Sequence, residues 1–348
     1  MRSLVLSLAI AAPLAIASVV ASTPVPAIAF DAQDLQRLKT TGQCPGCDLR
    51  DAEIRNLNVQ NADLTGADLS GATITDSSLV GANFSRAALI GTTFRDVDLG
   101  RSQFFQTRLR NGKFSGVNFA GASIRESWLR GADLAGADWR GVTVDRLVLR
   151  EADLSGANLS GLALQRSQFI GANLTGATLT GAIATRANFE GANLDRVIAG
   201  EVNFTGASFR SAQVRRADFF GANLSAVNSD GADWSETLLA GSTLRGSSFQ
   251  GVQAERVNLQ RAIATSSNWT GADVSGSSLY RMNFGASILR SLDLSGADAR
   301  QVNFGGAQLA DANFTDTNVE RSYFLGANLA GSSFSAAIGG DRARFAQF

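Results

Sequence analysis

Residues 62–71 read ADLTGADLSG, the same five-residue unit written twice. In each unit a small residue comes first, a polar residue second, a large apolar residue at the centre and a glycine last. Stepping by five from Leu49 keeps this phase as far as Phe334, which gives 58 consecutive pentapeptides without an insertion or a deletion. The central residue is Leu, Phe, Ile, Val or Trp in 52 of them. An internal repeat this regular is the first feature that a prediction of the fold must explain.

A period of five fits neither an α-helix nor an ordinary β-strand. It fits a chain that turns a corner every five residues, so that four pentapeptides make one square coil. The central side chain then fills the axis, and the first residue of each unit also points inward where only a small side chain fits. At four units a coil, the 58 units make about 14.5 coils. If the coils stack like parallel strands, about 4.8 Å apart, the rod is roughly 70 Å long.

Some centres are too small to fill such an axis. An isoleucine precedes three of them, and we expect the core to be thinner and less stable at all six. They are Ala184, Ala199, Ser229, Ala254, Ala264 and Ala299.

The units resemble the pentapeptide-repeat family, whose pattern is A-(D/N)-L-x-x. The residues that carry the resemblance include 62–66, 67–71 and 172–176, and it extends over residues 47–336. It implies an all-β solenoid, a single right-handed quadrilateral parallel β-helix, with no enzymatic activity common to the family.

Residues 1–29 have the layout of a secretory signal peptide. Arg2 precedes an apolar run from Leu4 to Val20, and Ala27-Ile28-Ala29 is a small-residue cleavage site. Cleavage would leave a chain that begins at Phe30. An uncleaved membrane anchor is the alternative, although the run is short for a bilayer span and contains a proline.

Residues 30–46 are expected to cap the first coil. Asp31 to Thr41 reads as a short helix, with Asp31 or Asp34 as its N-terminal carboxylate and Gly42 as its end. Cys44 and Cys47 follow it as a C-x-x-C pair; we expect a structural disulfide, with reduced core thiols or a redox-active pair as alternatives. Exported members of the family carry a similar C-x-x-C-D-L segment after a leading helix, and this resemblance suggests a periplasm or a thylakoid lumen.

Residues 337–348 lose the period and are expected to cap the other end. Phe345 and Phe348 would form a lid on the last coil or an apolar contact that joins two copies of the chain in a homodimer. The lid is the interpretation that we favour, because the terminal repeats of solenoids generally need a cover.

The sequence contains little that indicates catalysis. Histidine is absent, which excludes histidine-based nucleophile activation and histidine-ligated metals. We therefore expect no enzymatic activity, no catalytic residues, no cofactor and no metal. The many Asp and Asn residues before the centres are interpreted as outward ladders, as in the column Asp133, Asp153, Asn173, Asn193, Gln213 and Asp233.

One part of the surface is predicted to be a candidate interaction patch. Steps of one full coil align arginines in consecutive coils along a face and its adjoining corner, with an outward tryptophan and valine between them. Arginine and tryptophan favour planar, stacked contacts and are enriched at binding hot spots. A merely solvated face is the alternative interpretation. The patch comprises Arg108, Arg110, Trp128, Arg130, Arg146, Val148, Arg150, Arg166 and Arg186.

These features predict a non-enzymatic protein-interaction scaffold outside the cytoplasm, with an unidentified protein partner and no stable membrane insertion after cleavage. DNA mimicry against a topoisomerase, a role known in the family, is the alternative. It requires a strongly negative rod and a cytoplasmic location. The 31 basic and 31 acidic residues balance, which opposes mimicry and also opposes nucleic-acid binding.

Overall fold

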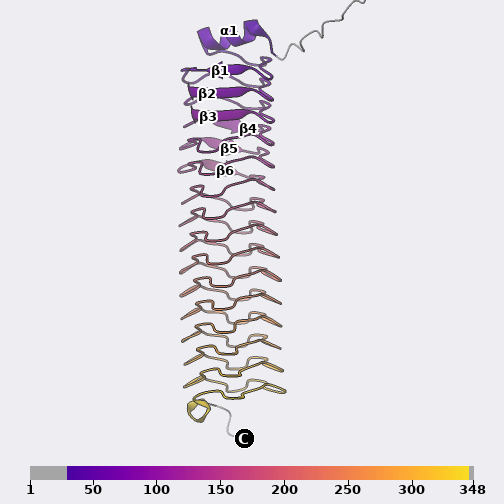
Figure 1. Ribbon diagram of the computed structural model, residues 1–348, viewed down its shortest axis with the longest axis vertical. Coiled ribbons are helices and arrows are strands. Elements are labelled where there is room, and N and C mark those ends of the chain that lie inside the picture. The colour runs from indigo at the N-terminus through magenta and orange to yellow at the C-terminus, as the bar shows by residue number, and fades with distance from the viewer. Residues whose placement is uncertain (1–29, 345–348) are drawn as a thin grey trace, which may run out of the picture.

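The computed structural model describes residues 30–344 and shows one rod of stacked coils with a helix across its first coil (Figure 1). The predicted signal peptide and the residues Phe345 and Phe348 lie outside the described residues. Within those residues, no helix is long and apolar enough to cross a membrane.

The regular elements are few and short, because each side of a coil is only a few residues long. They are α1 (Ala32–Thr41), β1 (Glu53–Arg55), β2 (Thr73–Ser78), β3 (Thr93–Asp98), β4 (Gln103–Phe105), β5 (Ser123–Arg125), β6 (Thr143–Asp145) and the 3-10 helix η1 (Gly340–Arg342). The strands form two parallel sheets, β1-β2-β3 and β4-β5-β6.

The pairing register confirms the square coil of four pentapeptides. Ile54 pairs with Ile74 and Ile74 with Phe94. Beyond β6 the same spacing continues as single-residue parallel pairings, for example Asn173 with Asn193. The fold is therefore the parallel β-solenoid that the five-residue period predicts.

The core lies along the axis of the rod and consists of the central side chains. Aromatic rings form long stacks there: the ring centroids of Phe189 and Phe209 are 5.1 Å apart in parallel planes, and those of Phe249 and Trp269 are 4.3 Å apart. The small residues two positions earlier are buried as well, as at Ala192. Their small size leaves the rings of neighbouring units room to stack.

A neighbouring side chain fills the space at one of the six small centres. Ser229 accepts a hydrogen bond of 2.6 Å from Trp234 Nε1, so an indole from the next unit occupies its space. The isoleucines before Ala184 and Ala199 do not fill the axis, because Ile183 and Ile198 are 43% and 47% exposed. Reduced stability at these coils remains a prediction.

The rod extends slightly beyond both of its predicted limits. At the start, Gln43 already pairs with Asp63, before the expected boundary at residue 47. At the end, Ile338 pairs with Asn318, and Arg344 pairs with Tyr323, where a full coil would have placed Ala343. The turn of η1 accommodates the extra residue, so coil pairing continues past residue 336 into the predicted cap.

Candidate interaction surface

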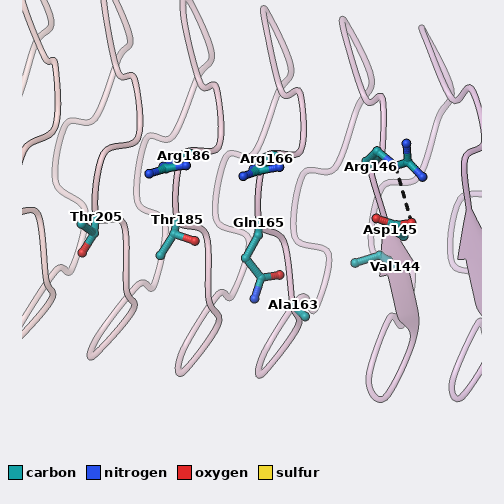
Figure 2. A pocket seen from close by; sticks show the side chains of 9 residues that line it. All are labelled: Val144, Asp145, Arg146, Ala163, Gln165, Arg166, Thr185, Arg186 and Thr205. Carbon is teal, nitrogen blue, oxygen red and sulfur yellow. Dashed lines mark ion pairs between the residues drawn. The ribbon is translucent and has the colours of Figure 1, made fainter.

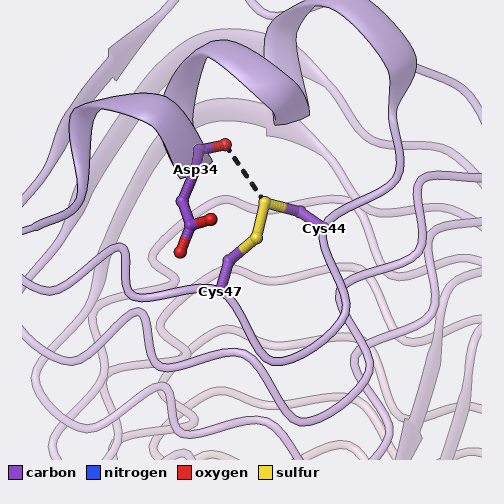
Figure 3. Close-up of side chains that lie close together, drawn as sticks. All are labelled: Asp34, Cys44 and Cys47. Carbon is purple, nitrogen blue, oxygen red and sulfur yellow. Dashed lines mark hydrogen bonds between the residues drawn. A yellow bond between two sulfur atoms is a disulfide. The ribbon is translucent and has the colours of Figure 1, made fainter.

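The first coil is tied to α1 around the two cysteines (Figure 3). Asp31 caps the helix, with its carboxylate accepting from Gln33 N–H, and Gly42 ends it in the left-handed conformation. Cys44 and Cys47 are joined by a disulfide and are both buried. Asp34, on the helix, accepts a 2.9 Å hydrogen bond from the backbone N–H of Asp48.

The same contacts argue for a structural role of the cysteine pair. Arg37 Nη2 lies 2.8 Å from Cys47 Sγ, so a helix side chain covers the disulfide. Asp34 and the two sulfurs lie close enough together to suggest a metal site. A structural zinc site needs thiolates, however, and sulfurs joined to each other cannot supply them.

The outward Asp and Asn residues form the predicted ladders. The column from Asp133 to Asp233 pairs in unbroken parallel register. Asn173 Nδ2 donates to Asp153 Oδ1 at 3.0 Å across neighbouring coils, and Asp153 Oδ1 also accepts from the N–H of Ser155 at 2.9 Å. These carboxylates hold the corners of the rod, and their contacts account for them without catalysis.

The tryptophan of the candidate patch stands out from one face of the rod. Arg108, Trp128 and Val148 pair in successive coils, and Trp128 is 45% exposed. A hollow of ≈ 210 Å³ lies beside the indole and is lined by Glu126, Ser127, Trp128, Arg146 and Val148. Arginines lie along both edges of the face that carries this indole. Such a surface suits a partner that stacks on the indole or offers planar groups to the guanidinium groups.

The arginines at the far edge of that face are only partly neutralised. Arg130 donates to both carboxylate oxygens of Glu151, at 2.9 and 3.2 Å. The pKa of the Glu151 carboxyl is held below its ordinary value, because Arg130 donates to it and the charges of Arg150 and Arg110 add to the effect. Within residues 30–344, Arg110 and Arg150 form no ion pair. The edge therefore keeps a positive excess.

The corner arginines form the other side of the patch (Figure 2). Arg146 pairs with Glu126 at 2.7 Å and with Asp145 at 3.6 Å. Arg166 and Arg186 form no ion pair in the described part of the chain. Both adopt the left-handed conformation, with φ of 58° and 57°, which glycine adopts at lower cost.

A broad hollow of ≈ 710 Å³ opens beside this corner. Figure 2 shows the Arg166 and Arg186 side chains lying parallel above it, with the polar side chains of Gln165, Thr185 and Thr205 below. Two guanidinium groups with hydroxyl and amide neighbours can hold an oxyanion through several hydrogen bonds at once.

The structure thus brings the nine predicted residues to one region but divides them between two faces. Arg146 stands at the shared corner and lines both hollows. Sequence reasoning missed Gln165, Thr185 and Thr205, because such residues recur all along the rod.

It also missed a second arginine hollow near the end of the rod. This hollow has a volume of ≈ 630 Å³ and is lined by Arg281, Gln301, Arg321, Tyr323, Arg342 and Arg344. The coil period would have aligned Arg281 with Arg321. Arg342 and Arg344 follow the extra residue at η1 and could not have been placed by the period.

The comparisons with known proteins agree with this architecture. The sequence matches the family described as Pentapeptide repeats (8 copies) over residues 44–71, 67–104, 102–138, 129–161, 163–198, 187–225, 230–261, 267–306 and 303–338. The chain belongs to the pentapeptide-repeat family. A comparison with curated proteins gave no match.

Solved structures of pentapeptide-repeat proteins are similar to it. QnrB1, a plasmid-mediated fluoroquinolone resistance protein, is 17% identical, with a TM-score of 0.38 over 56% of this chain and 92% of QnrB1. HetL from the cyanobacterium Nostoc is 26% identical, with a TM-score of 0.19 over 82% of this chain and 87% of HetL. A pentapeptide-repeat protein of the Arabidopsis thaliana thylakoid lumen is 32% identical, with a TM-score of 0.24 over 31% of this chain and 68% of that one.

Proposed function

We propose that this pentapeptide-repeat protein is a non-catalytic scaffold that binds a partner protein through the arginine and tryptophan patch. The observation that carries the proposal is the exposed Trp128 between two groups of incompletely neutralised arginines on a rigid rod. Solenoids generally act by presenting an extended surface. Arginine and tryptophan are the residue types that contribute most to binding at protein interfaces.

The charge of the rod argues against DNA mimicry. Duplex DNA as long as the rod, roughly 70 Å, carries about 40 phosphate charges. The chain has no net charge, since its 31 basic and 31 acidic residues balance. A neutral rod does not reproduce such a field.

We further propose that the protein acts outside the cytoplasm, in a periplasm or a thylakoid lumen. The support is the leader-like sequence of residues 1–29, which ends in a small-residue cleavage site before Phe30. N-terminal sequencing of the protein from its native compartment should give Phe30 as the first residue. A cytoplasmic chain that retains its leader would contradict this part of the proposal.

The patch is tested by replacing Arg130→Ser, Arg150→Ser and Trp128→Asn together, because the repeat accepts serine and asparagine at these positions. The thermal midpoint should stay nearly unchanged, since exposed pairs such as Arg130–Glu151 contribute little. Partner recovered by crosslinking in the native host should fall by about tenfold, because hot-spot residues dominate such contacts.

The matched control carries Arg196→Ser, Arg216→Ser and Phe220→Asn, which remove two arginines and one exposed aromatic ring elsewhere on the rod. This variant should recover the partner as well as the unaltered protein does. Equal recovery by the patch variant would show that the partner binds another surface.

A further inference from the structure

One face of the rod lacks carboxylates over most of its length. It begins beside the Arg166 corner and follows a single parallel ladder from Ala163 to Tyr323. We name it the cationic face, and its outward positions contain no Asp or Glu. These positions are Ala163, Gln165, Ile183, Thr185, Asn203, Thr205, Asn223, Ser225, Thr243, Arg245, Ile263, Thr265, Asn283, Gly285, Asn303, Gly305, Tyr323 and Leu325.

The opposite face of the same coils is negatively charged. Its ladder runs from Asn173 to Asn313, and an outward cation there, Arg215, is paired with Asp195 at 3.0 Å. The charges of the full chain balance, yet those of the rod are unevenly distributed, so the rod is polarised across its width. A field of this kind steers a negatively charged partner to one side of the molecule. The outward carboxylates of the opposite face are Asp195, Asp233, Glu255, Asp273 and Asp293.

Each end of the cationic face carries an arginine hollow. The first contains Arg166 and Arg186, and at its border Asp145 pairs with Arg146 at 3.6 Å. The second contains Arg281, Arg321, Arg342 and Arg344. Carboxylates at the border neutralise the second hollow only in part. Glu320 lies 3.0 Å from Arg342 and 3.9 Å from Arg321, while Glu201 and Asp341 stand at the bordering corner.

The arginines of the second hollow are also held in place. Arg281 Nε donates to Gln301 Oε1 at 2.9 Å, and its guanidinium lies 5.0 Å from the centre of the Tyr280 ring. Contacts that position a guanidinium before binding reduce the entropy lost when it engages a carboxylate.

We propose that the cationic face binds an extended acidic segment of a partner protein, with carboxylates in both hollows. This inference rests on the proposed protein-binding function and assigns the chemistry of the partner. Asn, Thr and Ser side chains between the hollows can hydrogen-bond to an extended backbone. Ile183, Tyr323 and Leu325 are exposed beside the two hollows and can take apolar side chains of such a segment.

The geometry sets a minimum length for that segment. Seven coil steps separate Ile183 from Tyr323, which corresponds to about 34 Å at the usual strand spacing. An extended chain covers about 3.3–3.6 Å per residue, so about ten residues span the two hollows. A segment that reaches both hollows gains affinity because its second contact is intramolecular.

Two oligoglutamate peptides, one of about 6 and one of about 16 residues, test the inference by calorimetry at low ionic strength. If affinity depended only on the number of carboxylates, it would rise in proportion to that number. The longer peptide should exceed the affinity expected on that basis by at least about tenfold. Its affinity should fall as salt is added. Equal affinity per carboxylate for the two lengths would overturn the inference.

Variants locate the two contacts. Arg166→Gly with Arg186→Gly, or Arg281→Gly with Arg321→Gly, should each remove the advantage of the longer peptide. Glycine suits all four positions, because each has a left-handed backbone. Arg196→Gly with Arg216→Gly removes the same charge from another corner and should preserve the advantage. An equal loss in this control would mean unspecific attraction and would refute the site.

A polyphosphate of similar length serves as a competitor. Its phosphates can engage the arginines, but it should compete less strongly than the longer peptide, because it offers no peptide groups to the Asn, Thr and Ser side chains between the hollows. Competition as strong as that of the longer peptide would refute the assignment to a polypeptide. The variant with Arg130→Ser, Arg150→Ser and Trp128→Asn alters the neighbouring face and should bind the longer peptide normally, so failure here is distinguishable from failure of the proposed function.

Discussion

Phe209→Ala is expected to lower the free energy of unfolding by about 3–5 kcal/mol. Its ring is fully buried and stacks on Phe189 at 5.1 Å between centroids. It also contacts Phe204 at 5.2 Å and Trp234 at 5.5 Å edge-on. Truncation opens a cavity that these rings cannot close, because the stacked backbone fixes their spacing.

Equilibrium unfolding in urea, followed by circular dichroism, measures this loss. Phe220→Ala is the matched control, because Phe220 is 53% exposed and directly follows a buried centre. It should change the free energy of unfolding by less than about 0.5 kcal/mol. Similar losses for the two variants would show that the rings at the centres do not form the core.

Ala192→Leu is expected to destabilise the rod by about 2–3 kcal/mol through overpacking. Ala192 is buried in a column of alanines that includes Ala172 and Ala212. A leucine there would push against the neighbouring centres, and the backbone hydrogen bond from Asn193 N–H to Ala172 O fixes the distance between coils. The coils therefore cannot move apart to make room for the larger side chain.

Ala192→Ser provides the control. Some serines at this inward position donate to a carbonyl of the preceding coil, as Ser127 Oγ does to Phe104 O at 2.7 Å. Ser332, in the same column as Ala192, donates to Leu309 O at 2.7 Å in this way. A serine at 192 would reach the carbonyl of Phe169 in the same way, so its free energy of unfolding should stay within about 0.5 kcal/mol of the unaltered protein. A tolerated leucine at this position would contradict the close packing of the axis.

The fold was predictable because each pentapeptide repeats the same choice of side chains. The phase from Leu49 to Phe334 fixes which residues face the axis and which coils are neighbours. The helix limits followed from Asp31 and Gly42, whose capping roles depend on local chemistry.

The candidate site was only partly predictable, because the period places residues in columns but does not choose their partners. The bond between Arg130 and Glu151, for example, joins neighbouring coils one residue out of the column register. Likewise, the extra residue at η1 brings Arg344 beside Tyr323. The first contact depends on the length of the arginine side chain and the second on one irregular turn. The repeat pattern predicts neither.

A rigid rod should hold the two arginine hollows at a fixed separation, and binding of one extended segment to both depends on it. Spin labels on Ile183→Cys and Tyr323→Cys, measured by double electron–electron resonance, test this directly, since Cys44 and Cys47 are joined to each other and do not react. We expect a single narrow distribution centred at about 34 Å, the length of seven coil steps at the usual strand spacing. A broad distribution, or a maximum far from that distance, would contradict the rigid rod.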